Sequence, residues 1–152
     1  MSLKEETDAL KRIPLFANLD PAKLKLLAFM SQRLAFEPGH AVFAQGDAGD
    51  AAYIVLDGEA VISIDTPKGM IEIARMGRNE IVGEIAILCD VPRTAHVTAA
   101  ADKNLVCLKI EKNDFMGLIN EFPSMAVEIM RELARRIVNT NQQLRQAVVA
   151  KG

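Results

Sequence analysis

The chain has 152 residues, half of them hydrophobic, which suits one domain with one sizeable core. Its 18 Lys and Arg against 20 Asp and Glu leave a net charge of −2, so no overall positive field indicates nucleic-acid binding. No apolar run is long enough to span a membrane, no signal-peptide pattern opens the chain, and the two cysteines form no disulfide framework. These features together predict a cytoplasmic protein.

Residues 1–33 are predicted to form an N-terminal helical part. An apolar stripe interrupted by Pro14 comes first and is followed by the pair Asp20-Pro21. A second helix is expected to begin there, because aspartate is a good capping residue and proline fits the first helical position.

The pattern of residues 34–110 predicts short strands separated by turns. Glycine and proline mark the turns at 37–39, 46–49, 57–58 and 66–69. The predicted strands are 41–44, 52–56, 60–64, 70–76, 97–101 and 105–110. Many short strands at regular spacing indicate a sandwich, a jelly roll or a barrel.

Residues 111–152 are again predicted to be helical. Asn113 or Asp114 is expected to cap a short helix, and Pro123 to open a long one. Positions at alternating spacings of three and four form a heptad-like seam along the long helix: Met130, Leu133, Ile137, Thr140, Leu144 and Ala147. The seam packs either on the chain's own barrel or on another helix, and the length of the helix favours the second.

The same long helix carries a group of charged side chains. Glu132 is followed by Arg135 and Arg136, at helical spacings that bring opposite charges together. We expect them to form an exposed ion-pair face that contributes only tenths of a kcal/mol, about 0.2–0.5 per pair.

Residues 82–97 carry the most informative chemistry. Gly83 lets a ligand approach the backbone closely, and Glu84 is a carboxylate that accepts hydrogen bonds from hydroxyl groups. The apolar run 85–88 is long enough for one helical turn, whose first N–H groups face an anion. Arg93 offers a planar fork that matches two phosphate oxygens. A small ligand carrying both hydroxyl groups and a phosphate would use both charged residues.

This stretch resembles the phosphate-binding cassette of the cyclic nucleotide-binding domain. That family includes catabolite-activator-type regulators, regulatory subunits of cyclic-AMP-dependent kinase and nucleotide-gated channels. The positions that carry the resemblance are Gly83, Glu84, Ala86, Arg93, Thr94 and Ala95. The segments 45–49 and 53–58 resemble the family's first signature, although Phe43 and Ala52 stand where aliphatic or larger residues are usual.

The resemblance implies a mainly β fold with flanking helices. The expected core is a double-stranded β-helix, or jelly-roll, barrel between N-terminal helices and a long C-terminal helix. We therefore expect residues 1–152 to form one cyclic nucleotide-binding domain, with its barrel at 34–110, its cassette at 82–97 and its C-terminal helices at 111–152.

The resemblance also implies roles for the cassette residues. Arg93 is expected to pair with the cyclic phosphate, and Glu84 to accept the ribose 2′-hydroxyl. Backbone access is expected from Gly83, Ala86 and Ala95, and Ile85 is a further candidate ligand-binding residue. Thr94 is expected to reach either the phosphate or a guanine amino group.

A contact to the base is expected from the long helix. Thr140 and Asn141 match the positions at which bacterial activators of this family meet the adenine, with one side chain from each subunit of a dimer. Two polar residues that fix the register of a helix seam are an equally good interpretation.

The sequence thus predicts a non-catalytic sensor that binds cyclic AMP without a cofactor or metal and signals through its C-terminal helix. Its expected partners are a second copy of the chain and an effector protein, with no membrane contact and no direct DNA contact by this chain. Alternatives are a cyclic GMP-binding module, or a degenerate barrel used only for dimerisation or docking. A metal-dependent jelly-roll enzyme is disfavoured, because His40 and His96 belong to no cluster with ligand spacing.

Overall fold

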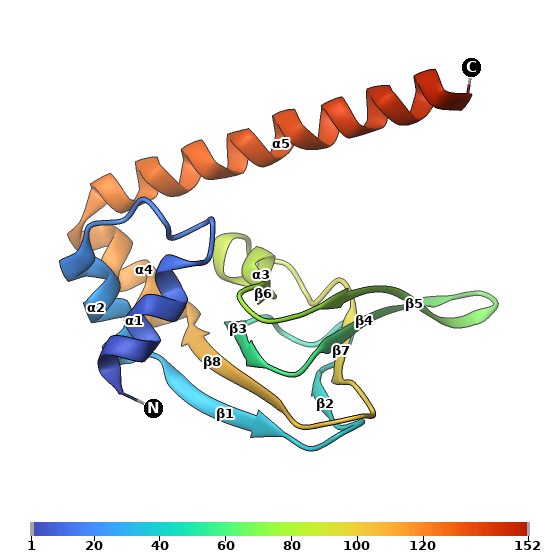
Figure 1. Ribbon diagram of the computed structural model, residues 1–152, viewed down its shortest axis with the longest axis horizontal. Helices are drawn as coiled ribbons and strands as arrows, with labels where there is room; N and C mark the ends of the chain where they lie inside the picture. Colours follow the sequence, from blue (N-terminus) through green and yellow to red (C-terminus); the bar gives the residue numbers. More distant parts are fainter. Residues whose placement is uncertain (1, 152) are drawn as a thin grey trace.

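The computed structural model describes residues 2–151, and for Ile85, Ala86 and Lys151 it describes the backbone alone. The elements in chain order are α1 (Leu3–Lys11), α2 (Pro21–Met30), β1 (Gln32–Phe36), β2 (Ala41–Phe43), β3 (Ala51–Asp57), β4 (Ala60–Thr66), β5 (Gly69–Met76), β6 (Ile81–Val82), α3 (Glu84–Leu88), β7 (His96–Ala99), β8 (Leu105–Glu111), α4 (Lys112–Glu121) and α5 (Pro123–Lys151). A β barrel lies beside α1, α2 and α4, and α5 extends past it as a long rod (Figure 1).

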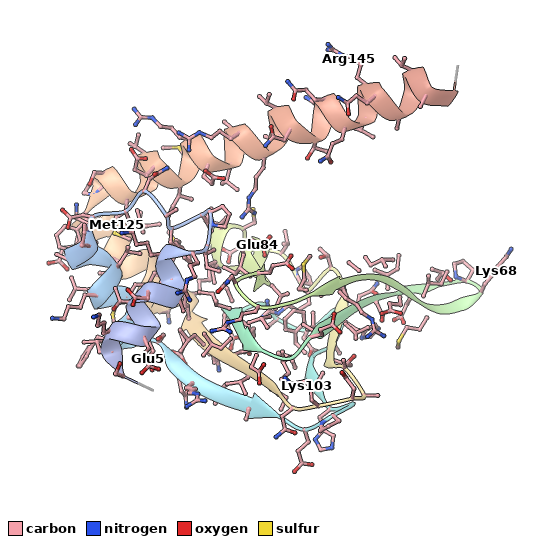
Figure 2. The ribbon with its side chains drawn as sticks, viewed as in Figure 1. Glu5, Lys68, Glu84, Lys103, Met125 and Arg145 are labelled. Carbon is pink, nitrogen blue, oxygen red and sulfur yellow. The ribbon has the colours of Figure 1, made fainter. Side chains whose placement is uncertain are left out.

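The strands form two four-stranded antiparallel sheets. Their orders are β1-β8-β3-β6 and β2-β7-β4-β5, which is the jelly-roll arrangement and confirms the predicted fold class. The hairpin of β4 and β5 projects from the barrel, with Lys68 at its tip (Figures 1 and 2). The barrel begins earlier than predicted, because β1 starts at Gln32 and pairs with Lys109 of β8.

Strand β3 shows why the barrel and the helices form one body. Its first five residues are all buried, because successive side chains point to opposite faces and both faces are covered. Tyr53 and Val55 face the interior between the sheets, whereas Ala52 and Ile54 face the helices. On the helix side, Phe16 and Phe115 pack with their ring centroids 6.0 Å apart.

The helix ends agree with the sequence at two points and differ at a third. Asp20 caps α2, since its side chain accepts a hydrogen bond from the Ala22 N–H, and Pro123 opens α5. The predicted cap of α4 was wrong: α4 begins at Lys112 directly after β8, and Glu111 at the cap position makes no side-chain capping bond. Within residues 2–151, no helix is long and apolar enough to cross a membrane.

The two cysteines are expected to differ in reactivity. Cys107 lies inside the barrel, where burial raises the pKa of its thiol to about 12, whereas Cys89 is exposed. The thiolate is the nucleophile, so near pH 8 an alkylating reagent should modify one thiol in the folded protein and two after denaturation. Mass spectrometry counts the adducts, and Cys89→Ser should leave the folded protein unmodified. Rapid modification of Cys107 in the folded state would contradict the expectation.

Candidate functional site

A pocket of about 150 Å³ opens between the end of β6, the loop before β7 and strand β2. Its walls are mostly apolar, with one carboxylate and one guanidinium among them. The lining residues are Phe43, Ile62, Met76, Ile81, Val82, Gly83, Glu84, Val91, Pro92, Arg93, Thr94, Ala95 and Val97. An apolar cleft with a few convergent polar groups is the usual form of a small-molecule site.

Gly83 allows the backbone and the Arg93 guanidinium to lie close together in this pocket. It joins β6 to α3 with φ at +80°, in the left-handed region that favours glycine. A Cβ atom at this position would lie 2.6 Å from Nη1 of Arg93 and 3.3 Å from the Ala51 carbonyl oxygen. The glycine therefore leaves the space that the guanidinium occupies.

Arg93 is held deep in the pocket by the backbone and by an aromatic ring. Only 5% of the residue is exposed. Its Nη2 donates to the Ala51 carbonyl at 2.7 Å, and its Nη1 lies 3.5 Å from the Gly83 carbonyl. The guanidinium carbon lies 3.9 Å from the centre of the Phe43 ring, which is cation–π geometry. These contacts fix the guanidinium plane.

The charge of Arg93 is only partly compensated. Burial lowers the pKa of its guanidinium, and the nearby Tyr53, Asp50 and Asp47 oppose that shift. The closest carboxylate oxygen, on the exposed side chain of Asp50, is 3.9 Å from Nη2. The buried Nε has no hydrogen-bond partner among the described residues. A buried cation with a free N–H group is suited to receive an anion.

Glu84 begins α3 at the rim of the same pocket, on the side that faces α5 (Figure 2). Its Oε1 lies 3.7 Å from Nη1 of Arg136, a residue of α5. The two side chains are 23% and 35% exposed, so this ion pair is accessible to solvent. Arg136 was expected on the exposed ion-pair face, but only Arg135 pairs with Glu132 there, at 3.0 Å.

The structure brings five of the predicted ligand-binding residues to one pocket and leaves two elsewhere. Gly83, Glu84, Arg93, Thr94 and Ala95 all line it. The side chains of the predicted residues Ile85 and Ala86 lie outside the described part, although their backbone belongs to α3. Thr140 and Asn141 are exposed on α5 and are not among the lining residues.

Three contributors to the site went unrecognised in the sequence. Phe43 covers Arg93, Ala51 supplies a carbonyl acceptor and Arg136 reaches Glu84. Phe43 did stand out as an unusual residue in the family pattern, and that was the available signal. The other two contacts join segments far apart in the chain, which spacing along the sequence does not reveal.

The two histidines lie in different surroundings. His40 is exposed in the turn before β2, with Nε2 3.6 Å from Glu37. His96 begins β7 and contacts Asp65 and the backbone of Gln45. Among the described residues, no group of three His, Cys, Asp or Glu side chains is arranged to hold a metal ion.

Comparison with known proteins gives the same family from sequence and from structure. The model of the cyclic nucleotide-binding domain matches residues 33–122, more than half of the chain. A CRP-like cAMP-activated global transcriptional regulator of Mycobacterium tuberculosis is 30% identical over 90% of this chain and 61% of its own length. A cAMP-dependent protein kinase regulatory subunit of Yarrowia lipolytica is 38% identical over 72% of this chain and 28% of its own.

A solved structure agrees with these relatives. The N-terminal domain of a transcriptional regulator from Streptomyces coelicolor superposes with a TM-score of 0.79 at 31% identity, covering 90% of this chain and 95% of that domain. The chain spans less than two thirds of the length of either relative named above. The jelly roll, the cassette and the sequence match together show that this chain belongs to the cyclic nucleotide-binding domain family.

Proposed function

We propose that this chain is a non-catalytic sensor that binds a cyclic nucleotide between β6, α3 and the loop before β7. The observation that carries the proposal is Arg93, a buried guanidinium in a mostly apolar pocket, whose Nε has no hydrogen-bond partner among the described residues. Its guanidinium N–H groups would meet the single negative charge of the cyclic phosphate. Residues 1–152 would form one domain for this purpose.

The other cassette residues would divide between sugar and phosphate. Glu84 would accept the ribose 2′-hydroxyl, because a carboxylate beside the phosphate would repel it. Backbone groups of Gly83, Ile85, Ala86 and Ala95 would surround the phosphate, and the Thr94 hydroxyl would donate to it.

Cyclic AMP is the proposed ligand. Two relatives carry cAMP in their names, the M. tuberculosis regulator and the Y. lipolytica kinase subunit. Thr94 leaves cyclic GMP as the second candidate, because its hydroxyl can also accept a hydrogen bond from the guanine amino group. Calorimetric titration with both nucleotides tests the proposal, and tighter binding of cyclic AMP is the expected result. Binding of neither nucleotide would contradict the proposal and would favour the alternative of a barrel used only for dimerisation or docking.

Signalling is proposed to run through α5. Arg136 of this helix already contacts Glu84, the carboxylate assigned to the ribose. A bound 2′-hydroxyl would compete for the same oxygen atoms and change the contact that α5 makes with the site. A ligand shifts the helix only to the extent that it binds one arrangement more tightly. Thr140 and Asn141 would meet the base once a helix closes over the pocket.

A homodimer through α5 is proposed from its exposed apolar seam. Ile137 and Leu144 are 63% and 60% exposed, at heptad positions. Ile137→Glu should therefore convert a dimer into a monomer in sedimentation velocity, because it introduces two charges into the seam. Gln142→Glu adds the same charge away from the seam and should leave the dimer intact. A wild-type chain that sediments as a monomer at high concentration would contradict the proposal.

Phe43 is expected to contribute to affinity through Arg93. Cation–π contacts contribute about 0.5–2 kcal/mol, so Phe43→Leu should weaken cyclic nucleotide binding by roughly two- to thirtyfold. Phe36 packs on the same Tyr53 ring, with centroids 6.2 Å apart, but does not line the pocket. Phe36→Leu is the matched control, and equal losses of affinity in the two variants would contradict the assignment.

A further inference from the structure

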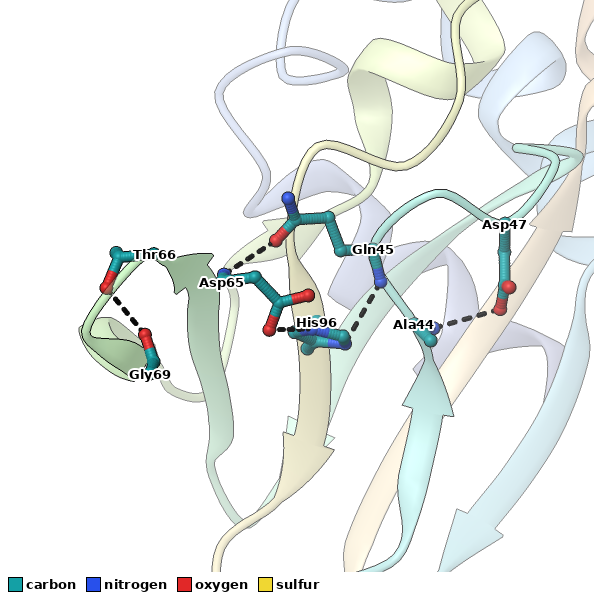
Figure 3. Close-up of polar contacts among 7 residues, drawn as sticks. All are labelled: Ala44, Gln45, Asp47, Asp65, Thr66, Gly69 and His96. Carbon is teal, nitrogen blue, oxygen red and sulfur yellow. Dashed lines mark hydrogen bonds and ion pairs between the residues drawn. The ribbon is translucent and has the colours of Figure 1, made fainter.

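His96 connects three segments of the barrel through both ring nitrogens. Its Nδ1 accepts a hydrogen bond from the Gln45 backbone N–H at 3.1 Å, and its Nε2 lies 2.9 Å from Oδ1 of Asp65. The Gln45 side chain completes a ring of three contacts, since its Oε1 accepts a hydrogen bond from the Asp65 N–H at 2.9 Å (Figure 3). The loop after β2, the end of β4 and the start of β7 are thereby joined.

The contacts assign the tautomer of the ring. Nδ1 can accept from Gln45 only while it carries no proton, so the hydrogen of the neutral ring lies on Nε2 and is donated to Asp65. Protonation would place a hydrogen on both nitrogens. The ring would keep Asp65 but would then face the Gln45 N–H with a second donor.

The loop that His96 holds is the loop that clamps Arg93. The Gly46 N–H donates to the Arg93 carbonyl, and the Arg93 N–H donates to the Asp47 carbonyl, each at 2.8 Å. The Asp47 side chain accepts the Ala44 N–H at 3.0 Å and closes the loop (Figure 3). The backbone of Arg93 is thus paired on both sides with residues next to Gln45.

We propose that His96 is a positioning residue for Arg93, and that protonation of its ring weakens nucleotide binding by releasing this loop. The proposal rests on the proposed function, because it assigns a control element to the same site. Histidine is the side chain that changes charge between about pH 5 and 8. Only 17% of the His96 side chain is exposed, so water replaces the lost Gln45 contact poorly.

The charged groups around the ring support one direction of response. Asp65 of β4 is the carboxylate in contact with it, and Nε2 can donate to that carboxylate in both the neutral and the protonated ring. Asp47 of the loop is engaged by Ala44, and Glu72 and Arg75 of the neighbouring strand β5 pair with each other. Protonation therefore removes the hydrogen bond from the Gln45 N–H and loosens the loop after β2, while the contact with Asp65 is kept.

The test compares three variants by fluorescence titration with a cyclic AMP analogue between about pH 8 and pH 5.5. One lost hydrogen bond corresponds to about fivefold in affinity, so the wild-type dissociation constant should rise by about that factor on acidification. His96→Asn keeps an oxygen acceptor near Nδ1 and does not titrate, so its affinity should stay high throughout. His96→Leu should bind about fivefold more weakly at both ends. His40→Asn, at the exposed histidine, should follow the wild type.

Two results would overturn the inference: a wild-type affinity that is the same at both pH values, or a His96→Asn profile that follows the wild type. Failure of the wild type to bind near pH 8 would instead contradict the proposed function. In that case, amide hydrogen exchange at Gln45, Gly46 and Arg93 in the free protein still decides the role of His96. The protection factors of these amides, which are corrected for the intrinsic effect of pH on exchange, should fall on acidification in the wild type but not in His96→Asn, and equal protection factors in both proteins would overturn the inference.

Discussion

Replacing Arg93 with lysine is expected to weaken cyclic nucleotide binding by about tenfold, and replacing it with alanine by up to about a hundredfold. Hydrogen bonds to charged groups contribute roughly 1.5–3 kcal/mol, and about 1.4 kcal/mol corresponds to a factor of ten. Lysine keeps the charge but carries a single ammonium group. It cannot bind the Ala51 carbonyl and a phosphate with one rigid fork, as the guanidinium can.

The stability of the free protein is expected to change much less than the affinity. Removing the guanidinium deprives the Ala51 carbonyl of its donor, which costs about 1 kcal/mol. The same change relieves the protein of a buried, incompletely paired charge, and the two effects oppose each other. A variant that loses affinity while remaining folded would show that Arg93 acts in ligand binding and not in folding.

Calorimetric titration with cyclic AMP measures the affinity. Urea unfolding without ligand measures the stability. A ligand at a hundred times its dissociation constant stabilises the wild type by about 2.7 kcal/mol; at the same ligand concentration Arg93→Lys should lose about half of that gain and Arg93→Ala most of it. Arg33 is an exposed arginine on β1, and Arg33→Ala should keep both the affinity and the gain. Unchanged affinity in Arg93→Ala would remove the central argument for the site.

The fold was predictable where local signals and burial agree. Asp57-Gly58 marks the turn at which the chain passes from β3 in one sheet to β4 in the other, and Asp20-Pro21 marks the start of α2, because each depends on neighbouring residues alone. The two strands flanking Asp57-Gly58 do not pair as a hairpin, because each pairs within its own sheet. Strand β6 has only two residues, Ile81 and Val82, which is too short for any periodicity. Pairing across the barrel, such as β1 with β8, joins distant segments and follows from tertiary packing.

The site was predictable to the extent that its chemistry is contiguous in the chain. Glu84 and Arg93 are nine positions apart, and both lie where the cassette pattern requires. Phe43 and Arg136 belong to β2 and α5 and meet the cassette only in the folded protein. The sequence therefore predicted residues that meet at one pocket but not the residues that hold them in position.

Gly83→Ala is expected to lower nucleotide affinity by at least about tenfold, because it displaces Arg93 without removing it. The added methyl group would lie 2.6 Å from Nη1, closer than any normal contact. A long side chain often moves aside, but this guanidinium is buried, held at Ala51 and covered by Phe43. The alanine also has to adopt a φ of +80°, which costs roughly 1–2 kcal/mol in folding stability.

Gly39→Ala is the control that distinguishes the clash with Arg93 from the backbone strain. Its φ is +78°, almost the same as that of Gly83, but a Cβ atom there would meet nothing within 4 Å. Gly39→Ala should therefore lower the free energy of unfolding by a similar 1–2 kcal/mol, roughly, while leaving nucleotide affinity unchanged. Urea unfolding and calorimetry on both variants give the comparison. If the two variants bind equally well, the guanidinium is free to move, and a fixed Arg93 cannot be the basis of phosphate recognition.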